Sequence, residues 1–136
     1  MVAEDRLAFR LKSQPGYVDG SSFQNANLAQ VPRDTIFLSL ENSAVTDEGV
    51  RSLPDLTALR CLDLDSTAIT DAAFQKVSTF INLEELWIED TAVTDACIRY
   101  LSALHKLRFV SIIDCAISDR AILELQQYIP DLEIHR

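Results

Sequence analysis

Residues 67–71 read Thr-Ala-Ile-Thr-Asp (TAITD), and near copies of this stretch occur three more times in the chain. SAVTD occupies residues 43–47, TAVTD occupies 91–95 and CAISD occupies 115–119. Successive copies are 24 residues apart. A fixed period of this length is the signature of a repeat protein, in which each structural unit stacks on the next.

Alignment on this stretch divides most of the chain into four units and a short end. The units are 35–58, 59–82, 83–106 and 107–131, and a terminal strand is expected at 132–136. Residues 1–34 are predicted to form an N-terminal cap, because a stack of repeats needs its exposed end covered. Within the cap, Leu7, Phe9 and Leu11 alternate with other residues before turn signals, which predicts either a strand-turn-strand or a short helix.

Each unit is predicted to contain one strand and one short helix. Apolar residues alternate at its start, as expected for a strand with one buried face. These pairs are Leu38/Leu40, Leu62/Leu64, Leu86/Ile88 and Val110/Ile112. The Thr-Asp or Ser-Asp pair that follows favours a helix start, since the hydroxyl caps the first turn and the carboxylate suits the helix dipole. Such a unit cannot bury its own apolar face, so the units must stack side by side.

With these features the chain resembles leucine-rich repeat proteins with short repeats, of the bacterial or cysteine-containing type. LRCLDLDSTAI (59–69) and LEELWIEDTAV (83–93) match the pattern L-x-x-L-x-L-x-x-N/C-x-L. The resemblance covers roughly residues 35–136 and implies an α/β fold, a right-handed solenoid with a parallel sheet on the concave side and short helices on the convex side. Four small polar residues are expected to hydrogen-bond the turn that leaves each strand: Ser43, Thr67, Thr91 and Cys115.

The formal net charge of −9 lies in the repeats. Residues 1–34 hold four acidic and four basic residues, whereas residues 35–136 hold 17 acidic and 8 basic ones. This charge repels nucleic acid and anionic membranes at long range. We therefore expect a protein partner of basic character, with no nucleic acid and no membrane.

The cysteines and the first residues predict a cytoplasmic protein. Glu4 and Asp5 stand where a signal peptide would be basic, and no apolar run is long enough to span a bilayer. Cys61, Cys97 and Cys115 are odd in number and form no C-x-x-C pair, so free thiols are expected. We expect Cys61 to be exposed and the most reactive, Cys115 to be buried, and the chain to be a monomer or weak homodimer.

Residues between the pattern leucines should form columns on the concave face. The columns are Phe37, Cys61, Glu85 and Phe109; Ser39, Asp63, Trp87 and Ser111; and Glu41, Asp65, Glu89 and Ile113. Strands lie about 4.8 Å apart, so Trp87 should contact Phe109 and have carboxylates around it. An exposed tryptophan in an acidic rim predicts a protein-binding site. Its predicted residues are Trp87, Phe109, Asp63, Asp65, Glu85, Glu89, Phe37 and Glu41.

Other interpretations of these residues stay open. The N-terminal segment or a homodimer contact could cover Trp87, and the acids could serve solubility alone. Carboxylates can hold Ca²⁺ or Mg²⁺ or act as acid and base, but a catalytic pair needs a carboxyl whose pKa is raised by burial. An open sheet face is expected to desolvate little. We therefore predict no catalytic residue, no metal site and no cofactor.

These expectations describe a non-enzymatic protein-binding module in one of two forms. The first is an acidic inhibitor or immunity-type protein that masks a basic toxin or nuclease with its concave face. Acidic leucine-rich repeat inhibitors of ribonucleases offer an analogy, although their repeats are longer. The alternative is a scaffold or adaptor that recruits a peptide or protein into a larger assembly.

Overall fold

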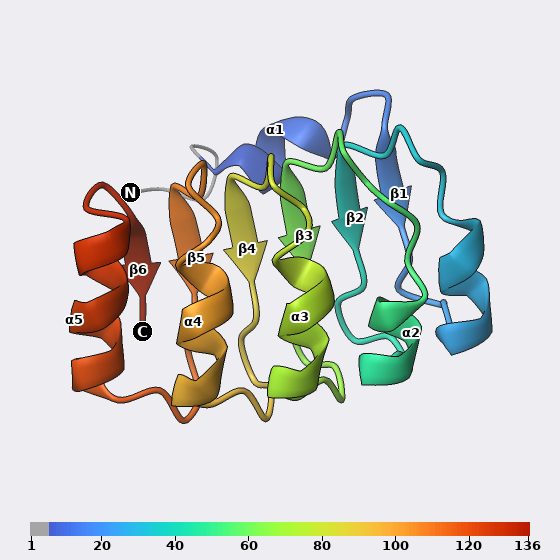
Figure 1. Ribbon diagram of the computed structural model, residues 1–136. Helices are drawn as coiled ribbons and strands as arrows, with labels where there is room; N and C mark the ends of the chain where they lie inside the picture. Colours follow the sequence, from blue (N-terminus) through green and yellow to red (C-terminus); the bar gives the residue numbers. More distant parts are fainter. Residues whose placement is uncertain (1–5) are drawn as a thin grey trace.

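Six short strands form one parallel sheet in chain order (Figure 1). The computed structural model describes residues 6–136. Its strands are β1 (Tyr17–Asp19), β2 (Phe37–Ser39), β3 (Cys61–Asp63), β4 (Glu85–Trp87), β5 (Phe109–Ser111) and β6 (Glu133–His135). The register joins equivalent positions of successive units, so that Leu38 pairs with Leu62 and Leu62 with Leu86. The α/β leucine-rich repeat solenoid expected from the sequence is confirmed.

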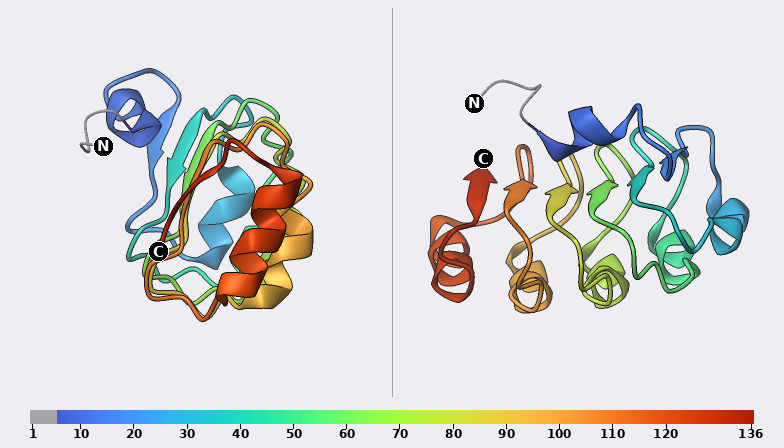
Figure 2. Two further views of the ribbon diagram at one scale, coloured as in Figure 1. Left: turned by 90° about the vertical axis from the view of Figure 1, so that its left-hand side faces the viewer. Right: turned by 90° about the horizontal axis from the view of Figure 1, so that it is seen from above.

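Short helices cover one face of this sheet (Figure 2). They are the 3-10 helices η2 (Asn25–Gln30), η3 (Asp71–Ala73) and η4 (Asp95–Cys97), and the α-helices α2 (Asp47–Arg51), α3 (Phe74–Val77), α4 (Ile98–Leu101) and α5 (Asp119–Tyr128). The opposite face of the sheet is called the concave face below. Among residues 6–136, no helix combines the length and the apolar character needed to cross a membrane.

The core lies between the sheet and these helices. Leu38, Leu62 and Leu86 point from the strands into it and are fully buried. Phe74 and Leu101 meet them from the helical side and are fully buried too. This arrangement gives every unit the same buried layer, so the leucine pattern of the sequence is explained by packing.

A left-handed residue ends the strand segment of each repeat. Asn42, Ser66, Asp90 and Asp114 have φ values of 59°, 54°, 54° and 61°. Asn and Asp reach this region more readily than most residues, because their short polar side chains can bond locally. The turn sends the chain from the sheet toward the helical layer.

The hydroxyl ladder predicted at this turn holds in the two central units. The Thr67 and Thr91 hydroxyls donate to the carbonyl oxygens of Leu64 and Ile88, each at 2.8 Å. The prediction is wrong for Ser43, whose buried hydroxyl has no hydrogen-bond partner in the described part of the chain. Cys115 is half-buried rather than buried, because its Sγ turns back toward the preceding unit and lies 2.9 Å from the carbonyl oxygen of Ile88.

Aspartate side chains bind each unit to the next one. The backbone N–H and the hydroxyl of Thr70 donate to the two carboxylate oxygens of Asp47, at 2.7 and 2.6 Å. Asp71 accepts the same pair from Thr94, at 2.9 and 2.6 Å. Asp95 accepts them from Ser118, at 2.7 Å each. The aspartate therefore connects two units, a role beyond the helix start that the sequence predicted.

Asn25 makes the corresponding contact at the N-terminal end of the solenoid. Its side-chain oxygen accepts from the Thr46 backbone N–H and its side-chain nitrogen donates to the Thr46 hydroxyl, each at 2.9 Å. Residues from β1 to η2 thus continue the stack, since β1 pairs with β2 and η2 packs beside α2. The domain boundary at residue 34 stays a prediction.

Helix α1 (Leu7–Leu11) lies elsewhere, across the concave face (Figure 2). A tight turn that contains Gly16, with φ of 93°, connects it to β1. A Cβ at Gly16 would lie 2.5 Å from Cγ1 of Ile36, so this turn requires glycine. Only the later part of the predicted N-terminal cap therefore covers the end of the stack.

The aspartate contacts predict a graded pair of variants at position 71. Asp71→Ala should lower the free energy of unfolding by roughly 1–2 kcal/mol, because two hydrogen bonds to a charged acceptor are lost at a partly solvated site. Asp71→Asn should cost less, since Asn25 makes the same two contacts with an amide. Urea denaturation followed by circular dichroism measures both, and equal stability of Asp71→Ala and wild type would contradict this role.

Candidate functional site

Helix α1 covers the first column of the concave face. Phe37, Cys61, Glu85 and Phe109 are only 1%, 0%, 3% and 2% exposed. The strand register places them side by side as predicted. The expectation that this column is open is wrong, because the N-terminal segment lies over it.

One apolar face of α1 packs against this column. Leu7 and Leu11 are four residues apart, so they lie on the same side of the helix. They form a small hydrophobic cluster with Phe37 and Cys61, whereas Phe9 is 57% exposed. Burial raises the pKa of the Cys61 thiol, so Cys61 is not the exposed reactive cysteine that the sequence predicted.

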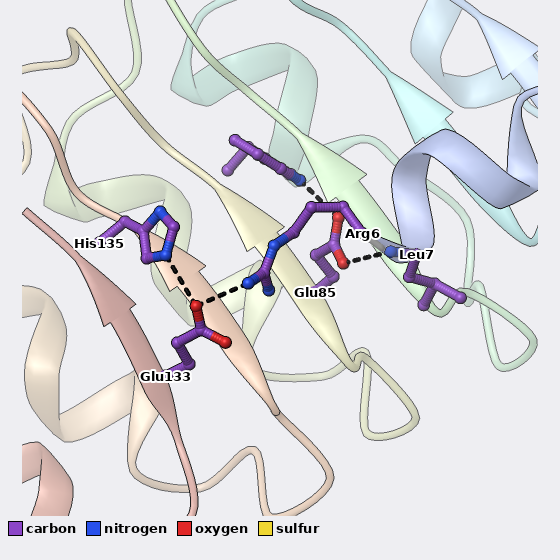
Figure 3. Close-up of polar contacts among 6 residues, drawn as sticks. Arg6, Leu7, Glu85, Glu133 and His135 are labelled. Atoms are coloured by element: carbon purple, nitrogen blue, oxygen red, sulfur yellow. Dashed lines mark hydrogen bonds and ion pairs between the residues drawn. The ribbon is translucent and has the colours of Figure 1, made fainter. Parts of the chain in front are cut away.

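The carboxylate of Glu85 holds the start of α1. It accepts a hydrogen bond from the backbone N–H of Leu7 at 2.8 Å (Figure 3). It accepts a second one from the backbone N–H of Ala8 at 3.0 Å. Amides in the first turn of a helix have no partner within the helix, so an acceptor here is stabilising. Glu85 also accepts from the Trp87 indole N–H at 2.8 Å, which fixes the ring beside the helix. A buried carboxylate is tolerated because donors surround it.

Arg6 joins α1 to the last strand. Its guanidinium lies 2.6 Å from the Glu133 carboxylate (Figure 3). It also lies 3.8 Å from the centre of the Phe109 ring. Glu133 also contacts Nε2 of His135 at 2.7 Å. The hydrogen bond from Arg6 lowers the pKa of Glu133 below its usual value. The contact combines an ion pair with a cation–π interaction.

Trp87 marks the border between the covered and open parts of the face. Its ring centre is 4.9 Å from that of Phe109, the neighbour that the strand spacing predicted. The side chain is half-buried, so α1 shields it only in part. It borders a pocket of about 210 Å³ between α1 and the sheet. The pocket is lined by Arg6, Ala8, Phe9, Lys12, Phe37, Glu41, Asp63, Asp65 and Trp87.

Three carboxylates meet in this pocket. Oxygen atoms of Glu41, Asp63 and Asp65 all lie within 4.8 Å of one another. Asp63 is 8% exposed, and burial raises its pKa to about 8, with the Asp65 charge adding to the shift. Burial likewise raises the pKa of Asp65 to about 7, even though the Glu89 backbone N–H donates to it at 2.6 Å. The expectation that this sheet face desolvates little is wrong for Asp63.

Internal hydrogen bonds account for the arrangement of this cluster. The Asp65 backbone N–H donates to Asp63 at 2.9 Å, and the hydroxyl of Ser111 donates to the Glu89 carboxylate beside it. Carboxylate oxygens would suit a hard cation, but acids placed by turn and strand contacts do not by themselves define a metal site. Because burial raises the pKa values of Asp63 and Asp65, an approaching cation would favour their charged forms.

The predicted site residues therefore fall into two groups. Phe37, Glu85 and Phe109 lie under α1. Trp87, Glu41, Asp65 and Glu89 keep exposed surface, with Asp63 below them. We call Glu41, Asp65 and Glu89 the open acidic strip; these residues follow the carboxyl ends of their strands.

Sequence reasoning missed Arg6, Leu7, Leu11 and Glu133 as parts of this site. The alternation of Leu7, Phe9 and Leu11 left a strand as one option, whereas the spacing of Leu7 and Leu11 alone fits a helix. Arg6 and Glu133 are 127 positions apart, so no local pattern could connect them.

Comparison with known proteins identifies the fold but no related protein by sequence. No known family matches the sequence, and neither does any curated protein. A leucine-rich repeat protein of Leptospira interrogans matches the structure with a TM-score of 0.61 at 18% identity, over 85% of this chain and 28% of that one. The actin-binding site 2 of leiomodin-1 matches with a TM-score of 0.61 at 14% identity, over 82% of this chain and 77% of that one.

A larger receptor contains the same architecture. TLR13, in its complex with ssRNA13, matches with a TM-score of 0.56 at 20% identity, over 90% of this chain and 21% of that one. The chain thus spans only 28% of the Leptospira protein and 21% of the receptor. With the six-stranded parallel sheet, these matches show that this is a leucine-rich repeat protein by fold.

The carboxylate cluster predicts a stability that falls as the pH rises. Asp63 and Asp65 have pKa values of about 8 and about 7 in the folded chain, above the usual value of about 3.9. The folded state therefore binds protons more tightly than the unfolded state, and this stabilisation is lost as the pH rises through the folded values. Between pH 5 and pH 8 the cluster should lower the free energy of unfolding by roughly 1–3 kcal/mol.

Asp63→Asn tests this prediction with an uncharged side chain of similar shape. Urea denaturation at pH 5, 6, 7 and 8 should give a smaller decline for the variant than for wild type. If the free energies of unfolding of the variant and of wild type fall equally with pH, the pKa of Asp63 is not raised in the folded chain.

Proposed function

We propose that this chain is a non-enzymatic protein-binding module that holds a basic segment of its partner on the concave face. The observation that supports this proposal most directly is α1 itself. Residues 6–12 carry Arg6, Arg10 and Lys12 and no acid, and they lie on a sheet whose facing side chains include Glu85, Asp63 and Glu133. The face thus already binds a basic, partly apolar segment within its own chain.

The accessible part of the site is the open acidic strip together with Trp87. A half-buried tryptophan offers a large contact area with little loss of side-chain entropy. The carboxylates beside it would attract a basic partner and select its orientation. The raised pKa values of Asp63 and Asp65 add to this, because a bound cation would stabilise the charged carboxylates that burial disfavours.

The inhibitor or immunity-type form of this proposal rests on the acidic repeats. A net charge of −9 favours fast association with a basic toxin or nuclease. The scaffold or adaptor form remains the alternative, with the charge serving solubility. The match to leiomodin-1 concerns an actin-binding region, which makes protein binding reasonable for a solenoid of this size. RNA, the ligand named for TLR13, suits this acidic face poorly.

A pull-down from native lysate with a matched pair of variants tests the site. The site variant is Glu41→Lys, Glu89→Lys and Trp87→Ala. Asp65 is left unchanged because it accepts the Glu89 backbone N–H. The control is Glu48→Lys, Glu124→Lys and Tyr128→Ala, which alters two exposed acids and one exposed aromatic residue on the helical side.

Both variants change the net charge equally, and both must keep the circular dichroism of wild type. We expect the site variant to lose a basic protein by about tenfold or more, because a tryptophan anchor and its charged surround are removed together. The control should retain that protein. If both variants capture the same proteins as wild type, the concave face is not the binding site.

Salt dependence separates the two forms of the proposal. For the inhibitor form, the association rate with the captured partner should fall about tenfold between low and high ionic strength, since steering by exposed charge is screened. Stopped-flow fluorescence of Trp87 follows the rate. A rate that does not change with salt would favour the scaffold form.

A further inference from the structure

We infer that α1 is a displaceable occupant of the concave face, and that the surface beneath it binds an amphipathic helical segment of another protein with the same chemistry. That segment has an arginine, a leucine directly after it, and a second apolar residue four positions further on. The inference rests on the proposed function and names the kind of partner that the site takes.

Three features of the covered surface recognise this pattern. Glu85 accepts the first free amides of the helix. Glu133 and the Phe109 ring receive the guanidinium, whose side chain is 10% exposed. The cluster with Phe37 and Cys61 takes the two leucines. Each feature specifies a different property of the occupant: a helix start, a planar cation and an apolar face.

None of these features depends on α1 being part of the same chain. The contacts come from β2, β3, β4, β5 and β6, all of which are ordered by the repeat packing. The core of the repeats is separate from the small cluster under α1. The surface would therefore persist after α1 has left, and a free segment could reproduce every contact.

Helix α1 is also poorly equipped to stay in place unaided. It has five residues, fewer than a helix needs to be stable alone in water. Leu7 and Leu11 are its buried apolar residues, Ala8 is only partly buried, and Phe9 remains exposed. Short elements with few buried apolar groups open locally at lower free energy than the core does. Opening would expose Phe37, Cys61 and Phe109 together with the Glu85 carboxylate.

Cys61 reports this opening in the unmodified chain. Its thiol is buried under α1, whereas Cys97 is buried in the main core. Alkylation followed by peptide mass spectrometry should modify Cys61 at least tenfold faster than Cys97, after each rate is divided by that of the same thiol in urea-unfolded chain. Equal corrected rates would mean that Cys61 is exposed only by global unfolding, and would overturn the inference.

A peptide of residues 6–14, acetylated and amidated, then tests recognition in trans. The full chain with Leu7→Ser and Leu11→Ser has a weakened α1, and Phe9→Ser is its control because Phe9 lies on the exposed side. We expect the peptide to bind the weakened chain at least tenfold more tightly than wild type or the control, since it no longer competes with α1. It should also protect Cys61 from alkylation.

Matched changes identify the contacts. A peptide with Arg6→Glu, a scrambled peptide of the same composition, and a weakened chain with Glu85→Gln should each bind at least tenfold less well. A weakened chain that keeps its circular dichroism and exposes Cys61, yet binds the peptide no better than the scrambled one, would overturn the inference. So would a wild-type chain that sediments as a dimer and becomes monomeric with Leu7→Ser and Leu11→Ser, because the occupant would then be α1 of a second copy.

This experiment has a different readout from the pull-down, although Trp87 in the site variant also donates to Glu85. The peptide assay probes Glu85, Glu133 and the covered column, whereas the pull-down probes the open acidic strip and Trp87. Loss of peptide binding with partner capture intact would reject the displaceable helix alone. If the peptide binds but the site variant captures the same proteins as wild type, the proposed site on the open strip is rejected instead.

Discussion

The aspartate that ends each of the first three copies of the repeated stretch accepts two hydrogen bonds from the next unit, and this contact aligns the units. Asp47, Asp71 and Asp95 each bind the backbone and the hydroxyl of the Thr or Ser that starts the following helix. The bonds fix the helical layer at the same spacing as the sheet. With both layers fixed, every position of one unit lies beside its counterpart in the next, and the side chains of the concave face form columns.

That alignment brings Glu85 into a column whose other members are apolar or aromatic. Phe37 and Cys61 stand on one side of it and Phe109 on the other. A carboxylate buried in such surroundings needs donors, and the start of α1 together with the Trp87 indole supplies them. One acid placed by the repeat thus contributes to holding the start of α1. The aromatic and apolar neighbours of that acid then receive Arg6, Leu7 and Leu11.

The sequence was sufficient for the strand order and for the neighbours across the sheet. The strand positions and the contact between Trp87 and Phe109 depend only on a spacing of 24 and on parallel pairing. The path of α1 could not be predicted in this way, since it depends on Arg6 meeting Glu133 across almost the whole chain. The errors about Cys61 and Asp63 share a cause: exposure was inferred for a sheet face treated as open, and both residues lie buried beside the segment that crosses it. Local sequence patterns specify helices and strands. Which segment lies over a sheet face depends on contacts between residues far apart in the sequence.

The two halves of the concave face differ in how their charge is compensated. Under α1, Glu85 and Glu133 have donors and a cation, and the pKa of Glu133 is lowered accordingly. Beside it, burial raises the pKa values of Asp63 and Asp65, and the neighbouring carboxylates add to the shift. Carboxyl groups whose pKa values are raised by burial at a pocket are the kind of local inconsistency often found at binding sites. A basic partner would gain most at the open strip, without any movement of α1. Its first contacts would form there and bring an arginine-bearing segment close to the helix that already occupies the matching surface.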